Sequence, residues 1–234
     1  MANWLTRIEH GVFVTGTDTG VGKTAVAGAI ARVLADAGRN VGVMKPIASG
    51  CLLRCGELIS PDADFLQTAA HTVDPIELVC PVRLRHPLAP TVAAALEHKK
   101  IDLARIRRAW AALKQRHECM IVEGIGGLLV SISARRTVAD LARDLGLPVL
   151  IVARPALGTI NHTLLTVEAA RRRDLSLMGV IIDRYPRRGA GLAERTNPAE
   201  LERVTGLPVL AILKDDPKVS VARGQLGSLP RQLV

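Results

Sequence analysis

The chain has 234 residues, is 48% hydrophobic but only 2% aromatic, and carries a formal net charge of +9. No apolar run approaches the roughly 20 residues needed to cross a bilayer, and the N-terminus lacks a basic start followed by an apolar stretch. We therefore expect a cytoplasmic protein without a membrane partner. Its length and its Ala-, Val-, Leu- and Ile-rich composition suit one α/β domain spanning residues 1–234.

The positive charge raises the question of nucleic-acid binding. The arginines are scattered along expected helices, and few aromatic side chains are available to stack on bases. Solvated helix faces are therefore the favoured interpretation, and we expect no nucleic-acid partner. Two arginine runs illustrate the pattern: Arg105, Arg107 and Arg108, and Arg171, Arg172 and Arg173.

The four cysteines form no C-x-x-C pair and lack histidines at zinc-finger spacing (Cys51, Cys55, Cys80 and Cys119). Reduced thiols are therefore favoured over disulfides or a structural metal. Cys51 and Cys55 share a loop, and redox sensitivity there is a less favoured alternative.

The first part of the chain predicts a strand, a glycine-rich loop, a helix and a second strand. "GVFVTG" is a β-branched apolar run, and "KTAVAGAIARVLADAG" has helical periodicity that stops at Gly38. "NVGVMKP" reads as the second strand. This unit is the minimal mononucleotide-binding half of a doubly wound sheet.

Further elements continue the alternation. After a loop over residues 47–61, helices are predicted over 62–70, 90–100, 103–117, 138–146, 161–174 and 197–206. Strands are predicted over 119–124, 147–153, 175–183 and 207–213. Residues 214–234 have little periodicity. The expected fold class is α/β, a doubly wound and mostly parallel sheet with helices on both faces, as in P-loop NTPases.

The loop "GTDTGVGKT", Gly16 to Thr24, has the chemistry of a phosphate site. Gly20 and Gly22 let consecutive backbone N–H groups approach an anion at a helix N-terminus. Lys23 would reach the β- and γ-phosphates, and the Thr24 hydroxyl would bind Mg²⁺. The loop has one residue more than the usual G-x-x-x-x-G-K-[ST] spacing, which removes none of these groups.

Three further residues lie where parallel strands end or just beyond. Glu123 ends the third predicted strand, at the edge where open α/β sheets bind ligands, and Asp62 follows the loop after the second. Both are candidate Mg²⁺ ligands, with helix capping or surface charge as the alternative. Lys45 ends the second strand, where it would either stabilise charge during phosphoryl transfer or point to solvent.

Four segments in order, "GTDTGVGKT", "KPIASG", "EGIGG" and "ALGTINHTLLT", resemble ATP-dependent dethiobiotin synthetase, from Gly11 to about Leu213. The longer phosphate loop is a mark of that P-loop branch. The resemblance implies an ATP-dependent ring-closing ligase acting on 7,8-diaminononanoate (diaminopelargonate) and CO₂. A carbamate forms on one amine, ATP phosphorylates it, and the second amine closes the ring of dethiobiotin and releases phosphate.

The resemblance also implies roles for individual residues. Lys45, Lys23 and Thr19 would be catalytic, Mg²⁺ would be bound by Thr24, Asp62 and Glu123, and Ser49 would contact the carbamate or a substrate amine. The implied nucleotide contacts are Gly20, Val21, Gly22, Lys23, Thr24, Ala25, Glu123, Gly124, Ile125, Gly126 and Asp183.

"GTIN", comprising Gly158, Thr159, Ile160 and Asn161, is similar to the family segment that binds the substrate carboxylate. The free N–H groups of a helix that begins there would attract an anion. In the family, one protomer contributes this segment to the site of the other across a two-fold interface, so the resemblance implies a homodimer. His162 is assigned no proton-transfer role.

The chain departs from the family at three positions. Asp183 stands where an Asn commonly reads adenine; it could accept from the adenine amine or from N1 and N2 of guanine, so the base preference is left open. Lys214 takes the place of a usual proline after the last strand. Thr91 stands where a histidine is common, although Pro87 and Pro90 match.

Two other functions are typical of proteins with related phosphate loops. Cobyrinate-type amidoligases share the longer loop but carry a C-terminal glutamine amidotransferase domain, which we do not expect here. Partitioning-type switch ATPases usually place a further lysine early in the loop, where this chain has Thr17, Asp18 and Thr19, and they lack "KPIASG".

Overall fold

The computed structural model describes residues 2–234, and its core is a six-stranded parallel sheet with the strand order β12-β11-β10-β1-β7-β2. The strands are β1 (Gly11–Gly16), β2 (Val41–Met44), β7 (Cys119–Glu123), β10 (Val149–Ala153), β11 (Leu177–Tyr185) and β12 (Val209–Lys214). Because every neighbouring pair is parallel, all six carboxyl ends meet at one edge. The predicted fold class is confirmed.

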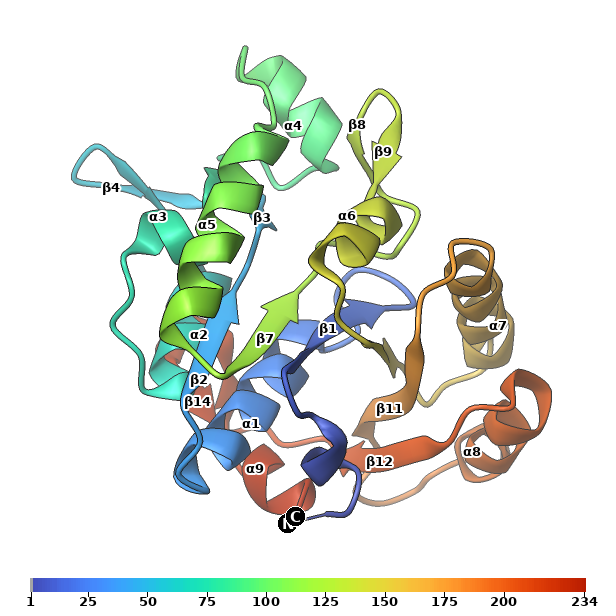
Figure 1. Ribbon diagram of the computed structural model, residues 1–234. Helices are drawn as coiled ribbons and strands as arrows, with labels where there is room; N and C mark the ends of the chain where they lie inside the picture. The colour runs from blue at the N-terminus through green and yellow to red at the C-terminus, as the bar shows by residue number, and fades with distance from the viewer. Residues whose placement is uncertain (1) are drawn as a thin grey trace.

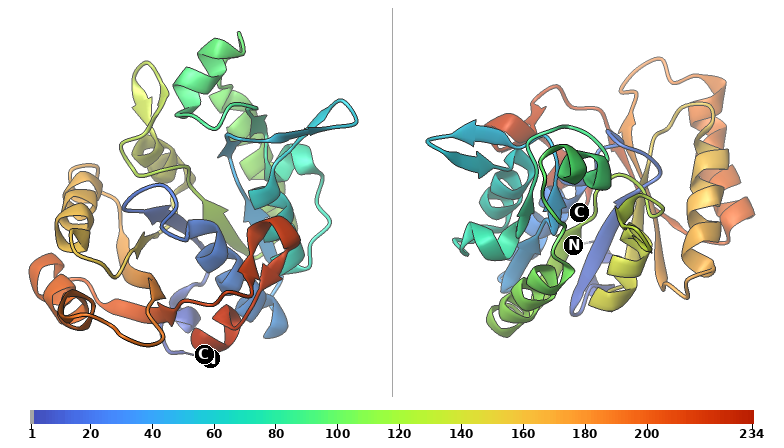
Figure 2. Two further views of the ribbon diagram at one scale, coloured as in Figure 1. Left: turned by 180° about the vertical axis from the view of Figure 1, so that it is seen from behind. Right: turned by 90° about the horizontal axis from the view of Figure 1, so that it is seen from above.

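Helices cover both faces of this sheet (Figures 1 and 2). Val12 and Val14 of β1 pack into one apolar cluster with helix α1, whereas Phe13 packs into a second cluster with α5 and α6. The alternation of strand side chains thus builds two cores. The longer helices are α1 (Lys23–Asp36), α2 (Pro61–Ala70), α5 (Leu103–Arg116), α6 (Val138–Leu145), α7 (Thr159–Arg171) and α8 (Leu192–Thr205).

Several short elements complete the chain. They are the 3₁₀ turns η1 (Leu5–Arg7) and η2 (Val221–Arg223), and the helices α3 (Ile76–Val79), α4 (Pro90–Leu96) and α9 (Leu229–Gln232). Short strand pairs are β3 (Ile47–Ala48) with β6 (Val82–Arg83), β4 (Leu52–Arg54) with β5 (Glu57–Ile59), β8 (Ser131–Ser133) with β9 (Arg136–Thr137), and β13 (Val219–Ser220) with β14 (Gln225–Leu226). Within residues 2–234, no helix is both long and apolar enough to span a bilayer.

The prediction of an unbroken loop over residues 47–61 was wrong. This segment contains β3 and the β4–β5 hairpin, whose turn places Cys55 at φ 49° and Gly56 at φ 82°. Positive φ at both central residues gives a turn that matches the right-handed twist of paired strands. The hairpin has no alternating apolar face because β4 is exposed throughout, so hydrophobic periodicity could not reveal it.

Several predicted boundaries also shift. Helix α7 begins two residues earlier than predicted, and α8 begins five residues earlier because Pro198 lies inside it rather than near its start. Helix α4 ends at Leu96, and His98 then adopts the left-handed region. Strand β11 runs on to Tyr185. Helix α1 ends at Asp36, with Gly38 at φ 83°.

The segment after β12 folds back against helices α1 and α2. Leu229 and Leu233 join the same apolar cluster as α1, and β13, η2 and β14 lie against α1 and α2. Figure 2 shows this red segment beside the blue helix α1. Tertiary packing rather than helical or strand periodicity orders it, and it completes one wall of the site described below.

Helix α1 approaches α2 closely at Gly28, where an added Cβ would lie 2.4 Å from Cε1 of the buried Phe65. We predict that Gly28→Ala lowers the free energy of unfolding by about 1–3 kcal/mol through overpacking, despite the higher helix propensity of alanine. Urea unfolding would measure it. In the double variant Gly28→Ala with Phe65→Leu, much of the clash should be relieved, so strictly additive losses would contradict this account.

Candidate functional site

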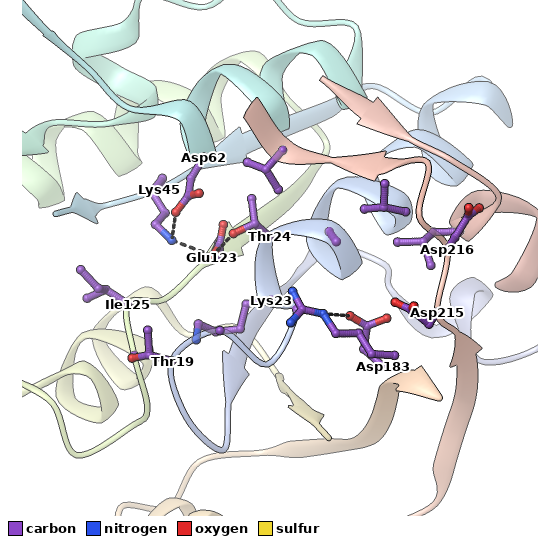
Figure 3. A pocket seen from close by; sticks show the side chains of 18 of the residues that line it. Thr19, Lys23, Thr24, Lys45, Asp62, Glu123, Ile125, Asp183, Asp215 and Asp216 are labelled. Atoms are coloured by element: carbon purple, nitrogen blue, oxygen red, sulfur yellow. Dashed lines mark hydrogen bonds and ion pairs between the residues drawn. The ribbon is translucent and has the colours of Figure 1, made fainter. Parts of the chain in front are cut away.

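A cavity of about 590 Å³ opens at the carboxyl edge of the sheet, where α1, β2, β7 and β11 converge with the segment after β12. Its position is that expected for ligands of doubly wound folds. The structure brings most of the predicted site residues together around it (Figure 3). Those lining it are Thr19, Gly20, Gly22, Lys23, Thr24, Ala25, Lys45, Ser49, Asp62, Glu123, Ile125, Gly126 and Asp183.

The phosphate loop leads directly into helix α1. Gly20 and Gly22 have φ values of 72° and 103°, in the left-handed region that glycine adopts without penalty. Gly22 is the N-cap of α1, so the backbone N–H groups of the first turn are available to an anion. Lys23 Nζ donates to the backbone oxygen of Asp18 at 2.8 Å. Burial lowers the pKa of Lys23 to about 8, which a bound anion would reverse.

A buried ionic cluster lies beside this loop. Lys45 Nζ is 2.6 Å from Glu123 Oε1 and 2.9 Å from Asp62 Oδ2, and Thr24 Oγ1 donates to the same Glu123 oxygen at 2.8 Å. Lys45 and Glu123 are almost completely buried. Burial alone would lower the pKa of Lys45, but Glu123 and Asp62 outweigh it and raise the pKa above its usual value. Lys45 therefore keeps its positive charge between the two carboxylates.

The same cluster has oxygen donors suited to a hard cation. Glu123 Oε2 is buried without a hydrogen-bond partner, next to the Thr24 hydroxyl and the Asp62 carboxylate. Within residues 2–234, no three His, Cys, Asp or Glu side chains form a metal-binding group. A cation here would thus rely on few protein ligands together with phosphate oxygens, as Mg²⁺ commonly does.

The opposite end of the cavity contains residues that the sequence had not indicated. The cavity lining that the sequence had not indicated consists of Arg184, Asp215, Asp216, Pro217, Val219, Val221 and Leu229. Lys214, read from the sequence as standing in place of a proline, is the last residue of β12 and does not line the cavity, whereas Pro217 does. A proline soon after the last strand was the only local signal for this part of the lining.

Some predicted residues do not line the cavity. Val21 is buried in the core, and Gly124 contributes only its backbone oxygen, which accepts from Lys45 at 3.3 Å. Thr91 lies in α4, outside the lining. The segment Gly158 to Asn161 lies at the start of α7, away from this chain's own cavity, with Gly158 as N-cap and the neighbouring Leu157 89% exposed. The buried Thr159 Oγ1 has no hydrogen-bond partner.

The four cysteines are unpaired, and only Cys55 is exposed. Burial raises the pKa of Cys51, Cys80 and Cys119, which disfavours the reactive thiolate.

Comparison with known proteins identifies the family. A family model described as an AAA domain matches residues 10–223. The chain is 46% identical over 221 residues to the ATP-dependent dethiobiotin synthetase BioD of Anaeromyxobacter sp. (strain K), covering 94% of this chain and 96% of that protein. The chain belongs to the dethiobiotin synthetase family. BioD of Thermodesulfovibrio yellowstonii is 43% identical (88% and 89% covered), and BioD of Bacillus subtilis (strain 168) is 41% identical (87% and 86% covered).

Solved structures show that this member of the dethiobiotin synthetase family shares its fold with P-loop ATPases. A ParA family ATPase from Chlorobium tepidum superposes with a TM-score of 0.59 at 16% identity, covering 95% of this chain and 96% of that chain. MinD in the MinC:MinD complex of Aquifex aeolicus has a TM-score of 0.57 at 17% identity, with 92% and 86% covered. Identities this low show a shared fold alone, so the partitioning-type alternative gains no support from them.

Asp183, at the far end of the cavity, is a buried carboxylate with a raised pKa. Burial raises its pKa from 3.8 to about 6, against the lowering effect of Arg184. Between pH 4 and 6 the folded protein therefore binds more protons than the unfolded chain, so the free energy of unfolding falls as the pH rises. We predict that Asp183→Asn stabilises the protein by about 1–3 kcal/mol at pH 8, and that this gain disappears near pH 4. Denaturant unfolding at both pH values would measure it.

Asp216→Asn is the matched control for this prediction. Hydrogen bonds from Ser228 and Lys218 lower the pKa of Asp216 to about 2, so its charged form favours folding above that pH. The control should lower stability at pH 8, opposite in sign to Asp183→Asn. A gain for Asp183→Asn that is equal at pH 4 and pH 8 would contradict the proposed burial cost.

Proposed function

We propose that this protein is an ATP-dependent dethiobiotin synthetase that closes the ureido ring of dethiobiotin from 7,8-diaminononanoate and CO₂. Identity of 41–46% to proteins of that name over almost the whole chain supports this function. The observation that carries it is the pair of lysines, Lys23 and Lys45, beside Thr24 and Glu123 in one cavity. The amidoligase and partitioning-type alternatives are not favoured by these relatives.

The reaction needs two steps after the carbamate forms and loses a proton. A carbamate oxygen attacks the γ-phosphorus of ATP and ADP leaves, which gives a carbamic–phosphoric anhydride. The second amine then attacks the carbonyl carbon, phosphate leaves and a second proton is lost. Negative charge gathers on the transferring phosphoryl group, where fixed cations lower the barrier most.

We assign the catalytic roles to residues of the cavity. Lys45 would leave its carboxylate partners to hold the carbamate and the γ-phosphate, and Lys23 would neutralise the β- and γ-phosphates. Thr19 would lie close to the reacting phosphate, and Ser49 would contact the carbamate or an amine. Their shared lining of the cavity is compatible with these roles.

Mg²⁺ is proposed to bind through Thr24, Asp62 and Glu123, and when bound it would supply positive charge next to the phosphates. The orphaned Glu123 Oε2 supports this assignment. The unpaired cysteines are consistent with the reducing cytoplasm, where we propose that the protein works.

We also propose that the protein is a homodimer in which Gly158, Thr159, Ile160 and Asn161 bind the carboxylate tail of a substrate held mainly by the other protomer. The segment begins a helix of 13 residues, whose N-terminus attracts anions. It does not line its own chain's cavity, and Leu157 and Leu165 expose apolar surface nearby.

Lys45→Ala tests the catalytic assignment. We predict that diamine-dependent phosphate release falls by about 10²–10³-fold, because the main cation facing the carbamate is lost. Purified protein would be assayed with Mg²⁺, ATP and bicarbonate, with and without 7,8-diaminononanoate, and the product identified by mass. Lys99→Ala, a surface lysine paired with Glu97, is the control and should leave the rate unchanged. Phosphate release by the unaltered protein that ignores the diamine would refute the proposed function.

Mixing tests the homodimer proposal. Lys45→Ala and Asn161→Ala chains should each be nearly inactive, but their heterodimer would contain one intact site. Co-expression of differently tagged chains should therefore restore about a quarter of the unaltered activity, since half of the dimers are mixed. No recovery in tandem-purified heterodimers would show that each chain uses its own segment.

A further inference from the structure

The cavity has two chemically different ends. At one end Lys23, Lys45, Thr24 and Glu123 form the phosphate region. Pro217, which directly follows Asp215 and Asp216, and the lining residue Val219 two positions later offer apolar surface suited to the faces of a flat ring. Figure 3 shows Asp183, Asp215 and Asp216 at the second end, on the side opposite Lys45 and Asp62. The carboxylates are the polar groups that a base would meet there.

These three carboxylates are not equivalent. Asp216 already accepts from Ser228 N at 2.7 Å, Ser228 Oγ at 2.6 Å and Lys218 N at 3.0 Å, so its oxygens are used in shaping the loop. Asp215 is exposed to solvent. Asp183 is only 4% exposed. The backbone N–H of Arg184 is a donor to it, but no side chain among the described residues donates a hydrogen bond to it.

Asp183 is held in place from two sides. It ends the buried run of β11, and a Cβ added to Gly22 would lie only 1.9 Å from its Oδ2. The carboxylate therefore sits directly against the phosphate loop. The nearest cation is Arg184, whose Nε lies 4.0 Å from Oδ2, beyond hydrogen-bond distance. A buried carboxylate without side-chain donors is costly unless a ligand supplies them.

We propose that Asp183 makes this pocket select guanine, because its two oxygens can accept from N1–H and the N2 amine of that base at once. Adenine and cytosine each present an amine next to a ring nitrogen that is itself an acceptor, so one carboxylate oxygen would face a lone pair. Uracil has a single N–H between two carbonyls. The inference rests on the proposed function and refines its nucleotide: ATP would remain a substrate, but GTP would be preferred over both ATP and CTP.

The charge state of Asp183 limits the pH range of this selection. The groups that face it are Arg184, on its own strand, and Asp215, after β12; Gly22 of the phosphate loop brings no titratable side chain. Burial raises the pKa of Asp183 to about 6, so the carboxylate is an acceptor at both oxygens at pH 8. Below pH 6 the protonated acid would both donate and accept, as an amide does, and the preference for guanine should weaken.

The test compares GTP, ATP and CTP at pH 8 by two measurements. Calorimetry with Mg²⁺ gives the affinity for each nucleotide without requiring turnover. Diamine-dependent phosphate release gives KM and kcat for each. We expect GTP to bind and to react with kcat/KM roughly tenfold or more above ATP and CTP, mainly through KM, as for a bidentate contact to a base.

Asp183→Asn is the decisive variant because an amide donates on one side and accepts on the other. It should reverse the order, with ATP or CTP preferred over GTP by a similar factor. Asp36→Asn removes a charge from an exposed position on α1 outside the cavity lining and should keep the order of the unaltered protein.

The outcomes separate the two proposals. Tighter binding of GTP that Asp183→Asn reverses would support the inference, whether or not dethiobiotin is formed. Tighter binding of ATP or CTP by the unaltered protein, or a preference unchanged in Asp183→Asn, would overturn it. Failure to form dethiobiotin with any nucleotide would overturn the proposed function, while the calorimetric order would still decide the role of Asp183.

Discussion

The buried contact of Lys45 with Glu123 and Asp62 is the constraint on which the site depends. The three residues come from the end of β2, the end of β7 and the start of α2, and the first two strands are direct neighbours in the sheet. Lys45 and Glu123 are almost completely buried, whereas the Asp62 side chain is 37% exposed. Buried charges are tolerated only in pairs, and removal of Lys45 or Glu123 leaves an uncompensated charge. The cluster therefore fixes how the segment between β2 and α2 returns to the sheet, and with it the position of Ser49.

The charges around the phosphate region explain why a metal ion belongs to the proposed mechanism. Lys23 and Lys45 bring two positive charges, and Asp62 and Glu123 bring two negative ones, so the protein alone offers little net attraction for a triphosphate. A divalent cation held by the carboxylates would turn them from repelling groups into ligands and would free Lys45 for the reacting groups. The proposed mechanism therefore requires the ion pairs of Lys45 to rearrange when ligands bind.

Much of this architecture could be predicted because its signals are local. A strand, a glycine-rich loop with Lys23 and Thr24, and a helix follow one another in the sequence, and parallel strands bring Lys45 and Glu123 to one edge. The ion pairing of Lys45 between two carboxylates was not predictable, because it depends on how α2 packs. The exposed β4–β5 hairpin likewise escaped hydrophobic periodicity, since neither of its strands has a buried face.

The end of the cavity that contains Asp183, Asp215 and Asp216 shows most clearly how little local sequence signals reveal. Residues 214–234 carry little periodicity because tertiary contacts with α1 and α2 order them, rather than long helices or strands of their own. Asp183, Asp215 and Asp216 are one residue type in one cavity, but their surroundings differ. Asp216 accepts hydrogen bonds from Ser228 and Lys218, and Asp215 is exposed to solvent. Asp183 is buried without a side-chain donor. Composition could not separate these three roles. What separates them is the supply of hydrogen-bond donors around each carboxylate, and a ligand able to supply the missing donors is the one that such a site should bind best.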